Sequence, residues 1–173
     1  GLVGKALVKQ CLSEGHTVHY LSTQKSKIVS QTNYKGFYWN PQENKIDIAC
    51  FEGVEVILNL AGTSIAQRWS NAAKASILSS RTDALALLHS SIETHNFPVK
   101  HIISASAIGV YPDSKTRYYD EKFQGADASF LRAVVKSWEG SLKPFQSIGV
   151  KTTALRIGIV LNSQEGALPK IMG

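Results

Sequence analysis

Segments with helical spacing and short apolar runs alternate along nearly the whole chain. Apolar residues recur with helical spacing over Leu2–Leu12 and from about Ser70 to His95, and a third helix is predicted over Ser129–Glu139. The remaining apolar runs are typical of strands: Thr17–Leu21, Phe37–Trp39, Val54–Leu58, His101–Ser104 and Val150–Leu161. Such alternation predicts right-handed βαβ units, and hence an α/β fold built on a doubly wound parallel sheet.

Length and composition fit a single domain. The 173 residues suffice for a substantial core, and an apolar content of 43% with 18% charged residues is ordinary for a globular protein. The longest apolar runs, such as Val54–Ala61, are far too short to span a bilayer, so no membrane association is expected. Cys11 and Cys50 lack metal-ligand spacing, which predicts two buried free thiols, no metal site and a cytoplasmic location.

Both ends of the chain look cut. The first predicted element is a helix with no strand before it, and segment 162–173 leads into no further element. No signal peptide is visible, although the chain begins without Met. We therefore expect residues 1–173 to form one nucleotide-binding domain that lacks its first strand and a following C-terminal part.

The positive charge does not indicate a nucleic-acid partner. The formal net charge is +6 and the pI is near 9.3, but the basic residues are scattered and form no run interleaved with aromatic residues. Affinity for an anionic small molecule explains the charge equally well. The sequence does not indicate an oligomeric state or a particular substrate.

The chain begins with two glycines at a predicted helix start, in the run Gly1-Leu2-Val3-Gly4. Glycines at this place let a pyrophosphate approach the backbone N–H groups and the positive end of the helix. Plain packing of helix against strand is the alternative. We favour the cofactor interpretation, in which these are the last two glycines of a GxxGxxG motif.

The second strand of such a sheet ends where the adenosine ribose of a dinucleotide is bound. This place corresponds to Leu21–Lys25, about 20 residues after the glycines. A site for NAD usually has Asp or Glu here, whereas this chain offers Ser22, Thr23 and nearby Lys25 and Lys27. The pattern favours the 2′-phosphate of NADP over NAD; a solvated turn is the alternative.

Small and polar residues follow two more predicted strands. Asn59-Leu60-Ala61-Gly62 and Ser104-Ala105-Ser106 come at strand ends, at the edge where such sheets bind ligands, and a serine there can position a substrate. Arg81 falls on the apolar stripe of the long helix. A buried guanidinium needs a partner, which is either a structural carboxylate or a phosphate or ribose of the cofactor.

Several motifs, taken together and in this order, resemble those of one superfamily. The chain resembles the extended, atypical branch of the short-chain dehydrogenases/reductases, and within it the epimerase-family proteins similar to nucleoside-diphosphate-sugar epimerases. The motifs are Gly1–Gly4, Asn59–Gly62, Arg68-Trp69 with Ser80-Arg81, Ser104–Tyr111, Trp138-Glu139 and Arg156–Leu161 with Gly166–Pro169.

The resemblance implies an NAD(P)-binding Rossmann domain with NADP as cofactor and a missing C-terminal substrate domain. It also implies roles for single residues: Ser22 and Thr23 at the adenosine end, Leu60, Ala61 and Arg81 along the cofactor groove, and Val160, on the last strand, near the nicotinamide. One departure concerns Thr23, because the family often has arginine at this position.

Relatives with established chemistry use Ser, Tyr and Lys, and the lysine lowers the pKa of the tyrosine. Counting back from Glu139 assigns the Tyr and Lys positions to Leu131 and Val135, which cannot transfer a proton. Tyr118 and Lys122 also form a YxxxK pattern, but their segment is polar and lacks a helical apolar stripe.

Two hypotheses follow. In the first, the chain is part of an NADP-dependent oxidoreductase or epimerase-like enzyme, Ser106 positions a small-molecule substrate, and Tyr111 or water handles the proton. Packing of Tyr111 on the substrate rim is the other interpretation of that residue. In the second, the protein binds NADP without catalysis, as a sensor or partner-binding protein, and Leu131 and Val135 fill the core.

Overall fold

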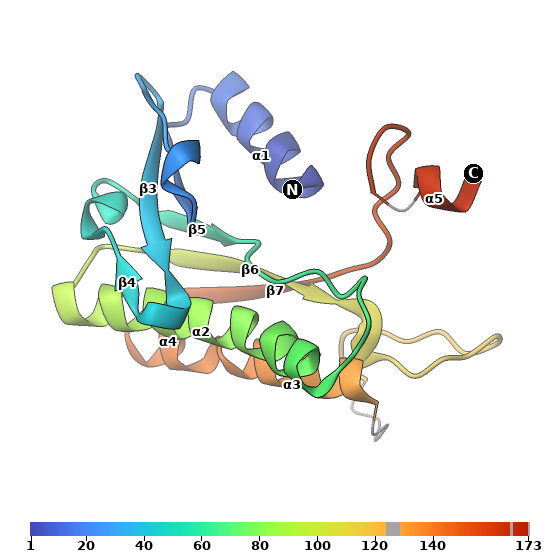
Figure 1. Ribbon diagram of the computed structural model, residues 1–173. Helices are drawn as coiled ribbons and strands as arrows, with labels where there is room; N and C mark the ends of the chain where they lie inside the picture. Colours follow the sequence, from blue (N-terminus) through green and yellow to red (C-terminus); the bar gives the residue numbers. More distant parts are fainter. Residues whose placement is uncertain (124–128, 167, 173) are drawn as a thin grey trace.

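The computed structural model describes residues 1–123, 129–166 and 168–172 (Figure 1). Its α-helices are α1 (Leu2–Ser13), α2 (Asn71–His95), α3 (Phe130–Gly140), α4 (Lys143–Ser147) and α5 (Leu168–Met172). Its strands are β1 (Val18–Ser22), β2 (Ser30–Gln31), β3 (Tyr34–Asn40), β4 (Lys45–Ile46), β5 (Val56–Asn59), β6 (His101–Ala107) and β7 (Lys151–Ile157). Short 3₁₀ turns include η1 (Lys25–Lys27) and η4 (Ile108–Val110).

The strands form two sheets. The order in one is β1-β3-β2, with β4 also pairing with β3, and the order in the other is β5-β6-β7. The pairs β1/β3, β5/β6 and β6/β7 are parallel, as the alternating pattern predicted, whereas the two-residue strands β2 and β4 run antiparallel to β3. These two short strands were not predicted, because two residues carry no readable periodicity.

The parallel sheet is divided between β1 and β5. Each of these strands has a hydrogen-bonded neighbour on one side only within the described part of the chain. The run Val54–Leu58 suits a central strand, yet Val56 is 50% exposed and Leu58 is 41% exposed. An apolar strand at an edge is the arrangement expected if another strand belongs between β5 and β1, because central parallel strands are buried on both faces.

Helices cover the β5-β6-β7 sheet on one side, where the core lies. In Figure 1, α2, α3 and α4 lie together below this sheet and α1 lies above it. The buried side chains of α2 recur with helical spacing, and Leu85, Leu88 and Ile92 are among those that join Ile102 of β6 and Trp138 of α3 in one core cluster. The amphipathic pattern of the sequence therefore identified the face of α2 that packs on the sheet.

One residue at each end determines where α2 begins and ends. Ser70 lies at the N-cap, where its Oγ accepts a hydrogen bond from the N–H of Ala73 at 3.2 Å. Asn96 follows the helix with a φ of 51°, in the left-handed conformation that asparagine tolerates. The long helix predicted from about Ser70 to His95 is confirmed.

The last strand is shorter than predicted. We expected it to run to Leu161, but β7 ends at Ile157, which is paired with Ala107, the last residue of β6. Because β6 provides no partner beyond Ala107, the ladder cannot continue. Val160 therefore lies after β7 rather than on it, in a segment that leads toward the N-terminus of α1 (Figure 1).

Cys11 and Cys50 are free thiols, as predicted, but only Cys50 is buried and Cys11 is partly exposed. Cys50 belongs to the core, and burial raises the pKa of its thiol to about 12. Among the helices of the described residues, none has the length and apolar character needed to cross a membrane.

Candidate functional site

A cavity lies at the N-terminal end of α1. It has a volume of about 520 Å³, and it is lined by Gly1, Leu2, Val3, Gly4, Leu60, Ile159, Val160 and Gly166. These residues come from the start of α1, from the end of β5 and from the segment after β7. The structure thus brings together the glycine run, Leu60 and Val160, which the sequence had assigned to the cofactor one by one.

The start of α1 leaves room and positive potential in this cavity. The described helix has neither a side-chain cap nor an acidic residue in its first turn, so its free N–H groups and the positive end of its dipole face the cavity uncompensated. A Cβ atom at Gly1 would meet nothing within 4 Å, and one at Gly4 would lie 3.6 Å from Cδ1 of Leu60. Gly4 and Leu60 therefore face one another in the lining of the cavity.

The segment after β7 forms the opposite wall of the cavity. Gly166 adopts a φ of +87°, and a Cβ atom there would lie 3.5 Å from Cδ2 of Leu2. Lys5 and Glu165 form an exposed ion pair at 3.0 Å between α1 and this segment. A surface pair of this kind adds little stability to the wall.

The loop after β5 is held by buried polar contacts. Asn59 donates from Nδ2 to Oγ of Ser104 at 3.0 Å, which connects the ends of β5 and β6. Its Oδ1 accepts a hydrogen bond from the N–H of Ala61 at 3.3 Å. Asn59 thereby fixes the backbone of Leu60 and Ala61 at the edge of the sheet.

Arg81 projects from α2 onto this loop. It is 9% exposed, its Nη1 donates to the carbonyl of Ile77 at 2.7 Å, and its guanidinium lies 5.0 Å from the ring centroid of Trp138. A Cβ atom at Gly62 would lie only 3.0 Å from Cζ of Arg81, so the glycine makes room for the guanidinium. Burial lowers the pKa of Arg81.

The described residues include no carboxylate in ion-pair contact with Arg81. The structural partner that the sequence left open is therefore not found in this part of the chain. A nearly buried cation without a carboxylate, directed at the loop where a dinucleotide would lie, fits a phosphate or ribose partner.

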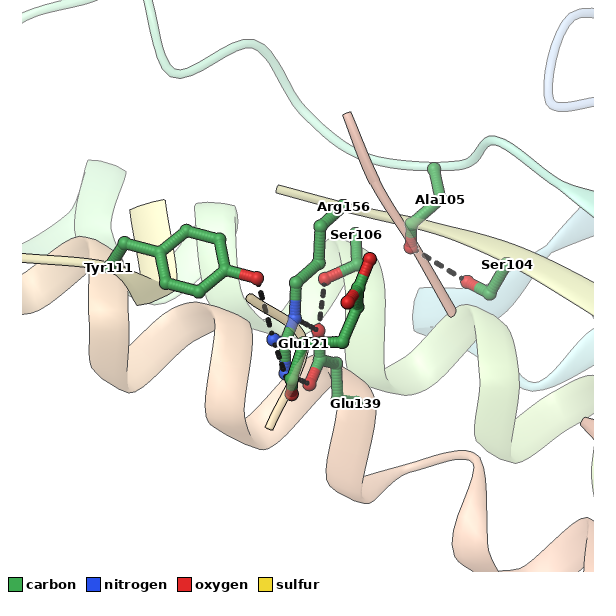
Figure 2. A network of polar contacts seen from close by, with 7 residues as sticks. All are labelled: Ser104, Ala105, Ser106, Tyr111, Glu121, Glu139 and Arg156. Carbon is green, nitrogen blue, oxygen red and sulfur yellow. Dashed lines mark hydrogen bonds and ion pairs between the residues drawn. The ribbon is translucent and has the colours of Figure 1, made fainter. Parts of the chain in front are cut away.

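A second group of polar residues surrounds Ser106 (Figure 2). Glu139 of α3 accepts hydrogen bonds from Oγ of Ser106 at 2.6 Å and from Arg156 of β7 through Nε at 2.8 Å and Nη2 at 2.9 Å. Nη1 of Arg156 donates to the hydroxyl of Tyr111 at 3.0 Å and to the carbonyl of Glu121 at 3.1 Å. Arg156 thus connects the two predicted catalytic residues, Ser106 and Tyr111.

The charges of this network stabilise each other. Burial alone would raise the pKa of Glu139, but the hydrogen bonds from Arg156 and Ser106 outweigh it, and the pKa lies below the ordinary value. The hydrogen bond to Glu139 is the largest of the effects that raise the pKa of Arg156. Glu139 is therefore a carboxylate at neutral pH, and Ser106 donates its proton to it.

Tyr111 belongs to an aromatic group. Its ring stacks on Tyr119 with centroids 5.8 Å apart, and Phe123 lies 6.1 Å from it. The guanidinium of Arg156 lies 5.3 Å from the centroid of the Tyr111 ring. Both predicted roles of Tyr111, proton donor and aromatic rim, are compatible with this position.

The positions assigned to Tyr and Lys lie on α3. Val135 is buried, with 3% of its surface exposed, and Leu131 packs near Gly109, where a Cβ atom would lie 3.3 Å from Cβ of Leu131. The other YxxxK pattern has a different setting: its segment is not helical between Tyr111 and Phe123, and Tyr118 is fully exposed. Tyr118 and Lys122 do not form a helical pair in this structure.

Ser22 and Thr23 lie at the carboxyl end of β1, outside the residues that line the cavity. Oγ of Ser22 donates to the carbonyl of Gln24 at 3.0 Å and accepts from the N–H of Gln24 at 3.1 Å, which closes a tight turn. Thr23 is exposed. Their assignment to adenosine remains a prediction.

Neither Glu139 nor Arg156 was assigned a catalytic or binding role from the sequence. A signal was present, because Arg156 lies in the middle of the predicted strand Val150–Leu161, whose other charged residue, Lys151, is near its start, and a charge inside a sheet needs a partner. The partner lies 17 positions away on a helix, so it could be identified only from the fold. In the described ranges, no group of three or more His, Cys, Asp or Glu side chains could hold a metal ion.

Comparisons with known proteins agree with this picture. The model of the NAD dependent epimerase/dehydratase family matches residues 1–128. The epimerase family protein Mb2239 of Mycobacterium bovis is 31% identical over 172 residues, which cover 99% of this chain and 54% of that protein. This chain therefore spans about half the length of the curated relatives it matches.

Two solved structures share the fold. The nucleoside-diphosphate sugar epimerase of Corynebacterium glutamicum superposes with a TM-score of 0.80 at 27% identity, covering 99% of this chain and 34% of that one. The human epimerase family protein SDR39U1 (isoform 2), solved with NADPH, has a TM-score of 0.75 at 23% identity, covering 99% and 55%. The predicted doubly wound Rossmann architecture is confirmed.

Proposed function

Because the chain belongs to the NAD dependent epimerase/dehydratase family, we propose that it binds NADP as the nucleotide-binding domain of an atypical short-chain dehydrogenase/reductase. The substrate would be a carbonyl compound or a sugar nucleotide that remains to be identified. The cavity at the N-terminus of α1 carries this proposal, because it joins the glycine run to Leu60 and Val160.

The residues around the cavity fit a dinucleotide. The pyrophosphate would lie against the N–H groups of Gly1–Gly4, where the helix dipole favours an anion. Leu60 and Ala61 would contact the dinucleotide along the loop after β5, Arg81 would supply a positive charge there, and Val160 would lie on the nicotinamide side. NADP, when bound, would donate or accept a hydride at the nicotinamide ring.

The preference for NADP over NAD rests on the carboxyl end of β1. No Asp or Glu follows this strand to hold a ribose 2′-hydroxyl, whereas Ser22, Thr23, Lys25 and Lys27 are nearby. SDR39U1, which shares the fold, was solved with NADPH. The two free thiols support a reducing, cytoplasmic location.

The network around Ser106 suggests how a substrate would be handled. The hydroxyl proton of Ser106 is donated to Glu139, so Ser106 can accept a hydrogen bond from a substrate hydroxyl. Tyr111 accepts a hydrogen bond from Arg156 and keeps its own proton, which it could give to a substrate oxygen. We assign the proton step to Tyr111 or to water, because Leu131 and Val135 occupy the usual Tyr and Lys positions.

The second candidate function is NADP binding without catalysis, in a sensor or partner-binding protein. The packing of α3 favours it, since Val135 is buried and Leu131 packs near Gly109. Both side chains then fill space that a catalytic pair would otherwise occupy. The cofactor site is the same in the two proposals.

The chain would be one part of a longer protein, with a strand before Gly1 and a substrate domain after residue 173. The free edges of β1 and β5 are an argument for the proposed strand before Gly1. The curated relatives, which are about twice as long, support the further domain. The experiments therefore use the complete polypeptide.

NADPH fluorescence and thermal shift test the binding proposal, and a panel of carbonyl substrates tests catalysis. We expect saturable binding of NADPH; no binding would contradict both candidate functions. Oxidation of NADPH with one class of carbonyl would support the enzyme, and tight binding without turnover on the whole panel would favour the non-catalytic protein.

If turnover is found, the variants Ser106→Ala and Tyr111→Phe test the assigned roles. Removing a proton donor lowers kcat by about a hundredfold or more. The affinity for NADPH should not change in either variant. The exposed Tyr118→Phe is the matched control and should keep full turnover. Loss of turnover in Tyr118→Phe, with Tyr111→Phe active, would reverse the assignment.

A further inference from the structure

We propose that the first turn of α3 forms an anion site in which Arg132 binds a carboxylate or phosphate group of the substrate. This inference rests on the proposed function and deepens it, because it limits the substrate to carbonyl compounds or sugar nucleotides that carry an anionic group. The site is separate from the start of α1, which lies on the other side of the β5-β6-β7 sheet (Figure 1).

Arg132 is a buried cation without a counter-charge in the part of the chain that the structure describes. Its side chain is 2% exposed, and its Nε and Nη1 are buried without a hydrogen-bond partner. None of the ion pairs between described residues includes it. The ring centroid of Phe123 lies 5.7 Å from Cζ of Arg132, and this contact offsets only part of the cost of burial. Because arginine stays charged when buried, binding of an anion would remove the rest of that cost.

The guanidinium of Arg132 lies at the start of α3. Arg132 is the third residue of this helix, and its N–H donates to Oγ of the N-cap Ser129 at 3.3 Å. Helical side chains lean toward the N-terminus, and Phe123, which Arg132 contacts, precedes the helix in sequence. The sequence of the first turn, residues 130–133, contains no Asp or Glu. The positive end of the helix dipole therefore adds to the charge of Arg132.

A second helix begins beside this turn. Trp69, which directly precedes the N-cap of α2, lies edge-on to Phe130 of α3 with ring centroids 5.3 Å apart. Nζ of Lys74, in the first turn of α2, lies 5.4 Å from the centroid of the Phe130 ring. Both helices have their N-terminal ends on the same side of the domain (Figure 1). Two positive helix ends and two cations thus lie around Phe130, and together they favour an anionic ligand.

The first turn of α3 also adjoins the residues that we assign to the substrate. A Cβ atom at Gly109, in the turn η4 that follows β6, would lie 3.3 Å from Cβ of Leu131. The ring of Phe123 lies 6.1 Å from that of Tyr111, the proposed proton donor. A substrate whose anionic group is bound by Arg132 would therefore have its reacting oxygen on the side of Tyr111. Because Phe123 lies over the guanidinium, we expect its ring to turn aside when the anion binds.

The test measures binding of inorganic phosphate and of malonate, a small dicarboxylate, to the complete polypeptide by titration calorimetry at constant ionic strength. The titrations are done with and without NADPH. We expect saturable binding of at least one probe under both conditions, and the tighter probe shows whether the site prefers phosphate or carboxylate.

Variants of α3 assign this binding to one side chain. Arg132→Met should raise the Kd of the probe by at least about tenfold, because charge-assisted hydrogen bonds are lost. Lys136→Gln removes an exposed positive charge from the same helix and should leave the Kd within about twofold of the wild type. Arg132→Lys keeps the charge without the planar fork, so its Kd should lie between those of the wild type and Arg132→Met.

Stability without a bound anion shows whether a carboxylate of the polypeptide itself is the partner. If Arg132 is unpaired, Arg132→Met should raise the Tm in a buffer free of multivalent anions, because an uncompensated buried charge is removed. If a carboxylate elsewhere in the polypeptide pairs with Arg132, the same substitution should lower the Tm.

The inference is overturned if neither probe binds, if Arg132→Met lowers the Tm in that buffer, or if Lys136→Gln raises the Kd as much as Arg132→Met does. Loss of probe binding in the presence of NADPH would also overturn it, because the anion would then occupy the site of the cofactor. A polypeptide that binds the probe through Arg132 but does not bind NADPH would contradict the proposed function and leave the anion site in place.

Discussion

Glu139 and Arg156 show how one pair of charges can organise a site. The carboxylate accepts two hydrogen bonds from the guanidinium, both side chains are about four-fifths buried, and the remaining contacts reach Ser106 and Tyr111. A bidentate pair of this kind fixes geometry as well as charge. The orientation of Ser106 and Tyr111 therefore depends on one residue of α3, Glu139, and one residue of β7, Arg156.

We predict that Glu139→Gln destabilises the protein by about 2 kcal/mol, because it leaves the partly buried Arg156 without its counter-charge. Urea unfolding at about pH 7 measures this difference. The control is Glu43→Gln, which breaks an exposed ion pair to Lys45 and should change stability very little. Equal effects of the two substitutions would contradict the structural role of Glu139.

The same pair should make stability depend on pH. The pKa of Glu139 in the folded protein is below the ordinary value of 4.5, so the folded protein binds this proton less readily than the unfolded chain. Its stabilisation is thus complete above about pH 4.5 and is lost as the pH falls through the folded-state pKa. The difference in unfolding free energy between wild type and Glu139→Gln should shrink at acid pH; a constant difference would count against the ion pair.

At the level of elements, α3 carries Leu131 and Val135 at the two positions that the family resemblance assigns to Tyr and Lys. The residues at those two positions are apolar, and one of them is buried in the packing between α3 and the rest of the domain. Ser129 accepts a hydrogen bond from the N–H of Arg132 and so begins the helix at the same place as predicted. The register of α3 is therefore fixed at both ends, by this cap and by Glu139.

Val135→Lys tests whether this position is closed. Burying an ammonium group there should destabilise the protein by about 3 kcal/mol or more. Ser137→Lys, on the exposed face of the same helix, should stay within about 0.5 kcal/mol of the wild type. Thermal and denaturant unfolding give both values. A stable Val135→Lys variant would show that the lysine position opens toward solvent or cofactor.

Elements whose ends are set by local sequence signals could be predicted, and elements whose ends depend on distant residues could not. Helix α2 has a long apolar stripe and a capping serine, and both signals are local in sequence. Strand β7 was predicted too long because its end depends on the last residue of β6, more than forty positions away, as the pair Ala107–Ile157 shows. The glycine run and the loop around Leu60 carried a local signal, and Val160 was assigned through the family resemblance, whereas the joining of Ser106 and Tyr111 through Arg156 required the fold.

At the level of the whole molecule, the division of the sheet is the main open feature. Strands β1 and β5 each have one neighbour in the described residues, and the exposed side chains of Val56 and Leu58 lie on β5. A strand inserted between them would pair with both and connect the two sheets. The glycine run would then directly follow that strand, as a dinucleotide-binding turn requires.

We predict that a polypeptide extended upstream of Gly1 by an apolar strand has a higher Tm than residues 1–173 alone. The gain should come with slower amide hydrogen exchange in β1 and β5, because their free edges become paired. Differential scanning calorimetry and exchange mass spectrometry measure these quantities. An unchanged Tm with unprotected β1 and β5 would show that the gap is not a strand position.

In the proposed function, the start of α1, the loop after β5 and the segment around Val160 together hold a nicotinamide dinucleotide. The most direct measurement is a crystal structure of the complete polypeptide grown with NADPH. We expect the pyrophosphate at the N–H groups of Gly1–Gly4, the adenosine ribose near the carboxyl end of β1, and the nicotinamide on the side of Val160. Density for the cofactor elsewhere, or this cavity filled by another segment of the protein, would contradict it.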